Sequence, residues 1–166
     1  MGIEAGASAV SIRNLSKSFG GTPAMADLHL DIAGGLGPLG GIATALRVEA
    51  AGASSKSACV LACDMPAVGA SLLDCLLDAR GRESPATVMR HPATGRVEPL
   101  PGIYEANAAT SIDESLEAGR LSVTAWLDET EARIVPAPPE LAWRLTNVNT
   151  PADLEMLESQ MHDGRE

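Results

Sequence analysis

The sequence predicts an α/β fold in which helices cover a largely parallel sheet. Short apolar runs suited to strands alternate with stretches of helical spacing, and this order is typical of layered α/β folds. The chain has 166 residues, 45% of them hydrophobic, so it can bury one core but is too short to suggest a second independent domain. We therefore expect a single domain over residues 1–166.

Two strands and two helices are expected in the first half of the chain. AVSIR at residues 9–13 predicts a short strand, and ACVLAC at residues 58–63 is a continuous apolar run typical of a strand buried on both faces. Residues 42–50 follow a glycine-rich turn with helical spacing. Residues 72–79 carry paired leucines ahead of Gly81, which predicts a second helix.

The second half adds further strands and helices. Extended stretches are expected at residues 86–90 and 99–104, and at ARIVPAP from Ala132, where proline marks a strand end or edge. Residues 107–118 predict a helix that ends at Gly119.

The last helix has the clearest start. Thr150 can cap it, Pro151 suits its first position, and Asp153 completes a capping-box-like spacing. Its expected apolar stripe consists of Leu154, Leu157 and Met161.

The charge balance argues against two classes of partner. The chain has 22 acidic and 12 basic side chains and a formal charge of -10, so it would repel both nucleic acid and an anionic membrane. The sequence has no basic start followed by an apolar run, so we expect no signal peptide. It also has no apolar run of the roughly 20 residues that a membrane span needs. We expect a cytoplasmic protein.

The three cysteines also fit a reducing compartment. Cys59, Cys63 and Cys75 cannot all pair, and they lack the spacing of a metal site. Cys59 and Cys63 would lie on one face of a strand, and we interpret them as small buried hydrophobic residues.

Asp64 is the first candidate site residue. It follows the apolar run in ACDMP, residues 62–66, and ligands in open α/β sheets gather beyond the carboxyl ends of strands. A carboxylate there suits Mg²⁺, which prefers one or two carboxylates with phosphate oxygens and water. An aspartate in this position is about as often a simple cap of the next turn.

The glycine-rich segment GGLGPLGGI, residues 34–42, is the second candidate. Its glycines let the backbone approach a ligand closely, and the following helix start offers free amides. On composition alone an ordinary loop is the better interpretation. The segment lacks the Lys-Ser/Thr ending of a Walker A loop, so it does not predict a triphosphate cradle.

NVNTPADL, residues 147–154, is the third candidate. Alternation places Asn147 and Asn149 on one side of an extended segment, where their amides could read polar ligand groups or complete a metal shell. Either amide could instead satisfy turn backbone.

Five motifs follow one another along the chain: GPLGGI, LACDMP, GRVEPLPGIY, LEAG and NVNTPADL. In this order they resemble the molybdenum cofactor guanylyltransferases, a family of nucleoside-triphosphate-dependent nucleotidyltransferases. The resemblance implies a three-layer, Rossmann-like fold with a mostly parallel mixed sheet. It also implies GTP and Mg²⁺ as ligands, and transfer of GMP to the terminal phosphate of molybdopterin with release of pyrophosphate.

The resemblance assigns site residues by position. Asp64 would be the catalytic residue and metal ligand. The other nucleotide-binding residues would be Ser11, Asp27, Gly37, Pro38, Leu39 and Gly40. The molybdopterin side would comprise Pro99, Arg120, Asn147 and Asn149, and molybdoenzymes or cofactor carriers would be possible protein partners.

One part of the family pattern is missing from this sequence. In the family, a first strand and a glycine-rich loop with an arginine and a lysine wrap the triphosphate, ahead of the equivalent of AGASAV. This chain opens with MGIEAGAS, which resembles the tail of the helix after that loop, so we expect the first strand and loop to be lacking.

The sequence leaves three alternatives. A cytidylyltransferase of the same superfamily would use CTP, although GPLGG and NVNTP favour guanine. A non-catalytic remnant or regulatory subunit is favoured by the missing loop. Residues 10–32 also resemble the opening strands of an ATP-binding-cassette domain, but no Walker A loop follows them.

Overall fold

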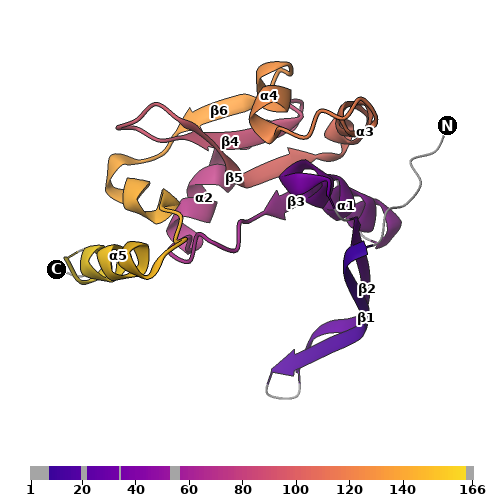
Figure 1. Cartoon of the computed structure of the whole chain (residues 1–166), viewed down its shortest axis with the longest axis horizontal. Helices are drawn as coiled ribbons and strands as arrows, with labels where there is room; N and C mark the ends of the chain where they lie inside the picture. Colours follow the sequence, from indigo (N-terminus) through magenta and orange to yellow (C-terminus); the bar gives the residue numbers. More distant parts are fainter. Residues whose placement is uncertain (1–7, 20–21, 34, 53–56, 164–166) are drawn as a thin grey trace.

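The computed structural model describes the backbone of residues 8–19, 22–33, 35–52 and 57–163, and the side chains of residues 35–47 and 57–161. Its main body contains a four-stranded sheet in the order β3-β5-β4-β6 (Figure 1). The strands are β3 (Ser57–Val60), β4 (Ala86–Arg90), β5 (Val97–Glu105) and β6 (Arg133–Pro136).

Three of these strands share one direction. Both β3 and β4 are antiparallel to β5, and β6 is parallel to β4, so only β5 is reversed. The reversal follows from the short connection after β4, where His91 N donates to Arg96 O and closes a hairpin. Three of the four strands therefore point the same way, as expected for a mostly parallel mixed sheet. Because the reversed strand β5 lies between β3 and β4, only β4 and β6 form a parallel pair.

Helices cover both faces of the sheet, which gives the expected three layers. Ala86 and Val88 lie in one core with residues of α1 (Gly37–Gly52), α3 (Ala109–Glu117) and α4 (Val123–Asp128). Met89 and Ile103 lie in a second core with α2 and the 3-10 helix that follows β6. Alternate residues of β4 thus face opposite layers, as a strand between two helical layers requires.

The first helix begins earlier than the spacing predicts. It starts at Gly37 rather than Ile42, because Pro38 is tolerated in a first helical turn. Gly40 lies so near Leu36 that a Cβ on it would come within 2.4 Å of the Leu36 Cβ. The glycine-rich segment therefore forms the first turns of α1 instead of an open loop.

The expectation that residues 58–63 are buried on both faces was wrong. The strand ends at Val60, and Cys59, Leu61 and Cys63 are exposed. Among the described strands β3 pairs only with β5, so it lies at an edge of the sheet. Within β3, Ala58 is buried and Cys59 is exposed, so one face of the strand is covered and the other is not. Cys59 and Cys63 are accordingly free, exposed thiols rather than buried hydrophobic residues.

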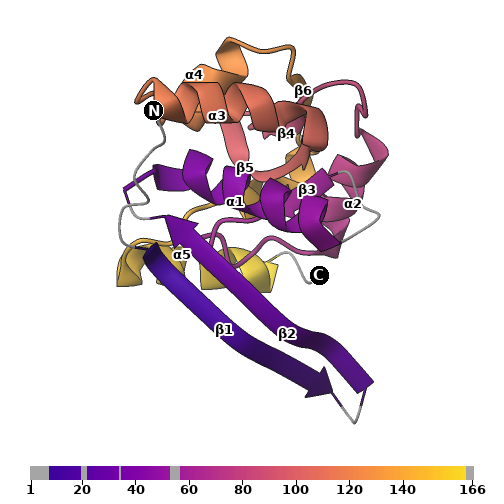
Figure 2. The ribbon, with the colours of Figure 1, turned by 90° about the vertical axis from the view of Figure 1, so that its right-hand side faces the viewer.

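The predicted strand at residues 9–13 lies within a longer strand, β1 (Ser8–Phe19). It forms an antiparallel hairpin with β2 (Thr22–Ala33), which extends away from the main body and leads into α1 (Figure 2). Ser11 lies in β1 and Asp27 in β2, and the side chains of both lie outside the described residues.

Helices α2 (Ala70–Asp78) and α3 lie close to the positions that the sequence predicts. Three elements were not predicted: β2, α4 and the 3-10 helix η2 (Pro139–Leu145). Within the part of the chain that the structure describes, no helix combines the length and apolar character that crossing a membrane requires.

The capping box of α5 (Pro151–Asp163) is confirmed. Thr150 Oγ1 accepts from Asp153 N at 3.2 Å, and Asp153 Oδ2 accepts from Thr150 N at 2.8 Å. The apolar stripe is only partly correct, because Leu157 is 2% exposed whereas Leu154 is 44% exposed. The helix therefore packs through Leu157, with Met161 half-buried.

Candidate functional site

The carboxyl ends of β3, β4 and β6 meet at one edge of the sheet, because these strands share a direction. The loop after β3 carries Asp64, the hairpin after β4 begins at His91, and the segment that follows β6 and η2 carries Asn147. Ligands of open α/β sheets collect at this edge. The topology therefore brings together residues that are far apart in the sequence.

Two hydrogen bonds fix Asp64. Its side-chain Oδ2 accepts from Asn147 Nδ2 at 2.9 Å, and its backbone oxygen accepts from Val148 N at 2.7 Å. Both donors come from the segment just before α5. The carboxylate is thus held in a defined position on a half-buried loop.

A third contact fixes the far part of the same loop. Arg144 Nη1 donates to Ala67 O at 3.0 Å, and the Arg144 guanidinium lies 4.4 Å from the centre of the Trp143 ring. The stack on the indole and the bond to the carbonyl orient the arginine together. The loop after β3 is therefore attached to the C-terminal segment at both Asp64 and Ala67.

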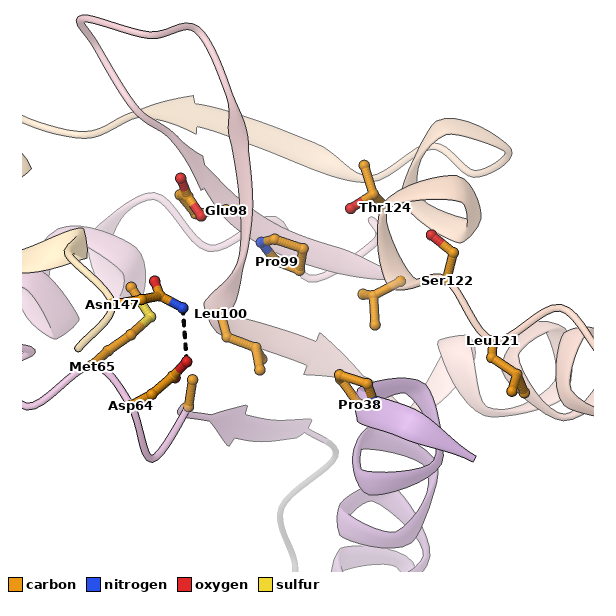
Figure 3. A pocket seen from close by; sticks show the side chains of 12 residues that line it. Pro38, Asp64, Met65, Glu98, Pro99, Leu100, Leu121, Ser122, Thr124 and Asn147 are labelled. Carbon is orange, nitrogen blue, oxygen red and sulfur yellow. Dashed lines mark hydrogen bonds between the residues drawn. The ribbon is translucent and has the colours of Figure 1, made fainter. Parts of the chain in front are cut away.

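A cavity of about 380 Å³ lies beside Asp64 (Figure 3). This volume is in the range of small-molecule sites, roughly 300–1,000 Å³. Asp64 and Asn147 lie at one side of it, Pro38 and Leu121 at the other, and Pro99 between them. Pro38 brings the first turn of α1 to the cavity, so the glycine-rich segment and the aspartate share one crevice.

Strand β5 is irregular where it lines the cavity. The register of its pairing with β4 shifts between Val88 and Met89, opposite the segment that contains Pro99 and Pro101. Proline lacks the N–H that a ladder needs, so such a shift is expected there. The irregular segment contributes Glu98, Pro99 and Leu100 to the cavity wall.

Glu98 is a buried carboxylate that is neutralised by Arg96. Arg96 Nε donates to Glu98 Oε1 at 2.7 Å, and Arg96 Nη2 donates to Oε2 at 3.0 Å. The Glu98 side chain is 8% exposed and that of Arg96 is 67% exposed. The hydrogen bonds to Glu98 raise the pKa of Arg96, so the guanidinium stays charged throughout the usual pH range.

A second cavity of about 430 Å³ lies beside the first and shares Glu98 and Asn147 with it. The residues that line this second cavity but not the first are His91, Thr94, Arg96, Leu145, Thr146 and Asn149. The site is therefore a pair of adjacent cavities, with Asp64 in the first and Arg96 in the second.

The structure brings together four of the residues that the sequence singles out. Pro38, Asp64, Pro99 and Asn147 all line the first cavity, although they come from four different segments. Asn149 lines the second cavity, and its backbone N also donates to Asp153 Oδ2 at 3.0 Å.

Three residues of the glycine-rich segment lie outside the cavity wall. Leu39 is fully buried in the core beneath α1, and Gly40 is buried against Leu36. Gly37 has a positive φ of 59° and lies near Leu121 O. Because successive side chains of a helix point in different directions, only Pro38 of this segment reaches the cavity.

Arg120 is also outside both cavities. Its Nη2 donates to Ser115 Oγ at 3.4 Å, and its Nε lies 3.8 Å from Glu129. The next residues, Leu121 and Ser122, do line the first cavity. The arginine at this turn is therefore adjacent to the site but directed away from it.

Several site residues were not singled out from the sequence. Glu98 stands in the GRVEPLPGIY motif, where its pairing with Arg96 two positions earlier could have been considered. Ser122 is the N-cap of α4, since its Oγ accepts from Ala125 N at 3.2 Å. Thr124 follows it into the cavity wall. A capping serine two residues after Arg120 was the available sign of this helix.

The donor set fits a magnesium ion that is shared with phosphates. Among the described residues no cluster of three or more His, Cys, Asp or Glu side chains could hold a metal ion by itself. Asn147 occupies one oxygen of Asp64 and leaves Oδ1 for another partner. A single carboxylate suits Mg²⁺, which takes its other ligands from phosphate and water.

Comparison with known proteins gives consistent matches. Residues 12–133 match the model of the MobA-like NTP transferase domain. A protein of Opitutus terrae named "probable molybdenum cofactor guanylyltransferase" is 39% identical over 123 residues, which cover 72% of this chain and 59% of that protein. A Mycobacterium avium protein of the same name is 34% identical, with 74% and 60% covered.

A solved structure shows the same architecture. The molybdopterin-guanine dinucleotide biosynthesis protein A of Archaeoglobus fulgidus matches with a TM-score of 0.62 at 26% identity, over 76% of this chain and 64% of that one. These matches confirm the α/β fold class and the resemblance drawn from the five motifs. This chain spans about three fifths of the length of its curated relatives. The chain belongs to the family of MobA-like NTP transferase domains.

Proposed function

We propose that the protein is a guanylyltransferase of molybdenum cofactor biosynthesis, which moves GMP from GTP to molybdopterin and releases pyrophosphate. The observation that carries this proposal is the position of Asp64, fixed by Asn147 in a cavity whose opposite side is the first turn of α1. The names of the curated relatives support the reaction and its substrates. The proposal treats residues 1–166 as one nucleotidyltransferase-like domain.

The nucleotide would occupy the side of the first cavity formed by α1. Pro38 lines that side, and Gly37 and Gly40 let the backbone of the same turn come close to a planar base. Ser11 and Asp27 are further proposed contacts, on the resemblance alone. Leu39 would act indirectly, by anchoring this turn in the core.

Asp64 would hold Mg²⁺ together with the phosphates of GTP. When bound, such an ion neutralises negative charge on the phosphates and on the departing pyrophosphate. The contribution of the chain is to hold the carboxylate at the correct place, through Asn147 and the backbone N–H of Val148.

Acceptor binding would fall to Pro99, Asn147 and Asn149, which line the adjoining cavities. An oxygen of the molybdopterin phosphate would form a bond to the α-phosphorus of GTP as the bond between that phosphorus and pyrophosphate breaks. Pyrophosphate leaves with the electron pair, and because a phosphate monoester is largely ionised at neutral pH, no side chain has to remove a proton. Rate enhancement would come from positioning and charge neutralisation.

Two other functions make different predictions. A cytidylyltransferase would bind CTP in preference to GTP. A non-catalytic subunit would bind neither nucleotide tightly. Location in the cytoplasm, and delivery of the product to a molybdoenzyme or a carrier protein, belong to the proposal for the guanylyltransferase alone.

Calorimetric titration of the full chain with GTP and with CTP, each with Mg²⁺, separates these possibilities. We expect GTP to bind and CTP to bind more weakly, and we expect pyrophosphate release when molybdopterin is added. Asp64→Asn should abolish release, whereas Asp74→Asn, on an exposed residue of α2, should leave it intact. Preference for CTP would replace guanylyl by cytidylyl transfer. Absence of binding to either nucleotide would favour the non-catalytic subunit.

A further inference from the structure

The second cavity differs from the first in the charge of its wall. Asp64 lines the first cavity but not the second, and Glu98 lines both. Arg96 lines the second cavity and a further one of about 570 Å³, but not the first. The bidentate ion pair with Arg96 cancels the charge of Glu98, so the shared wall does not repel an anion. An anionic group would thus meet a boundary without net charge, at which Arg96 can offer the N–H groups that Glu98 does not occupy.

Arg96 is held ready to bind such a group. Glu98 is fixed in β5 and buried, and it takes one N–H from Nε and one from Nη2 of the arginine. The guanidinium has five N–H donors in a rigid fork, so the pair leaves others free for a ligand. A side chain oriented in this way loses less conformational entropy when it binds.

The other groups of the second cavity suit a polar ring system. His91 and Thr94 come from the hairpin between β4 and β5, and His91 Nδ1 accepts from the backbone N of Ala93 and of Thr94 at 3.3 Å. Asn147 and Asn149 add amides that can both donate and accept. Amides and hydroxyls of this kind can pair with the ring nitrogens and carbonyl of a pterin.

We propose that Arg96 binds the phosphate of a phosphorylated pterin acceptor at the boundary of the two cavities, and that buried Glu98 is the positioning residue that aims it. This inference rests on the proposed function for the identity of the acceptor. It assigns the recognition of the acceptor's charge to Arg96 and Glu98, neither of which holds Asp64 or belongs to the proposed nucleotide side. The phosphate lies between Arg96 and Asp64, beside the shared residues Glu98 and Asn147.

The test compares two fluorescent probes, neopterin 3′-phosphate and neopterin, which differ only in the phosphate. Equilibrium titration of the full chain should show tighter binding of the phosphorylated probe. Arg96→Gln should lower the ratio of the two affinities by about tenfold, the usual effect of one charged hydrogen-bonding group, and Arg96→Lys should lower it less. Glu98→Gln should give an intermediate ratio, since its amide can accept only one of the two hydrogen bonds.

The ratio distinguishes recognition from structural support, because a general loosening of the cavity would weaken both probes equally. Arg47→Gln is the matched control: Arg47 is an exposed arginine that also pairs with a carboxylate, that of Asp113, away from both cavities. It should leave the ratio unchanged. An unchanged ratio in Arg96→Gln, an equal fall in Arg47→Gln, or no binding of the phosphorylated probe to the wild type would overturn the inference.

Parallel titration with GTP and Mg²⁺ separates this inference from the proposed function. If GTP binds in an Asp64-dependent way while the probe ratio ignores Arg96, the acceptor inference fails and the nucleotide assignment stands. If the ratio follows Arg96 while GTP does not bind, the inference stands and the guanylyltransferase proposal fails.

Discussion

Asn147 Nδ2 donates a hydrogen bond to Asp64 Oδ2 across 2.9 Å, and so joins two segments that are 83 residues apart in the chain. The backbone bond from Val148 N to Asp64 O lies beside it. Together they hold the loop after β3 against the segment before α5. The carboxylate is thus oriented before any ligand arrives, which is what a site that works by positioning needs.

Replacing Asn147 by alanine should weaken the metal-dependent binding of GTP. The substitution removes the partner that orients the Asp64 carboxylate, and loss of such a supporting hydrogen bond typically costs about tenfold or more in metal affinity. Titration of Mg²⁺ at fixed GTP measures the effect. Asn107→Ala is a suitable control, because Asn107 Nδ2 donates to Glu83 O elsewhere on the surface. Equal losses in both variants would contradict a specific role for Asn147.

Tyr104 supports the floor of the first cavity. Its hydroxyl donates to Pro99 O at 2.8 Å, and its side chain is fully buried against Trp126, with ring centroids 6.1 Å apart. Tyr104→Phe leaves the carbonyl without this partner, so unfolding should become easier by about 1–2 kcal/mol. Urea denaturation measures the change. A variant as stable as the wild type would show that water replaces the hydroxyl at no cost.

Tyr104 also makes the stability of the fold depend on pH. Burial raises the pKa of Tyr104 above its usual value of 10.0. Its contribution to stability is therefore complete below pH 10 and is lost as the pH rises from there toward the raised pKa of the folded state. Tyr104 is the only tyrosine in the chain, so absorbance at 295 nm reports it alone. We expect absorbance to stay flat past pH 10 and to rise together with loss of structure. Ionisation near pH 10 in the folded protein would contradict its burial.

The capping box of α5 also makes the stability of the fold depend on pH, in the acidic range. Hydrogen bonds from Asn149 N, the side chain of Thr150 and Thr150 N lower the pKa of Asp153. The contribution of Asp153 to the stability of the fold is thus present above its unfolded pKa of 3.8, and it is lost as the pH falls through the lower pKa of the folded state. The difference in Tm between wild type and Asp153→Asn should be constant near neutral pH and should shrink below about pH 4. A constant difference down to pH 2 would contradict this origin.

The sequence predicted this helix well because the information is local. Thr150, Pro151 and Asp153 lie within four positions, and their hydrogen bonds form whatever the rest of the chain does. The strand at residues 86–90 was predicted with correct bounds for a similar reason, since its apolar run is bounded by proline and histidine.

Errors arose where neighbours decide the outcome. Cys59 and Cys63 belong to an apolar run, but their exposure depends on whether another element packs over them, and a run of hydrophobic residues carries no record of its neighbours. Helix α4 is six residues long and has too few turns for periodicity to reveal it.

The site was predictable in part. Asp64, Asn147, Pro99 and Pro38 could be named from their motifs, and the structure places them around one cavity. The orientation of Arg120 and the pair of Arg96 with Glu98 could not, because both depend on side-chain packing between separate elements. The Leu39 side chain lies in the core and not in the cavity wall, and membership of a motif does not say which side of a helix turn a side chain occupies.

The central claim is that Asp64, held by Asn147, binds the divalent ion that accompanies the nucleotide. Electron paramagnetic resonance with Mn²⁺ in place of Mg²⁺ counts bound ions directly when GTP is present. The account predicts one protein-bound Mn²⁺ in the wild type and in Asp74→Asn, and none in Asp64→Asn at the same concentrations. Undiminished Mn²⁺ binding in a folded Asp64→Asn variant would contradict it.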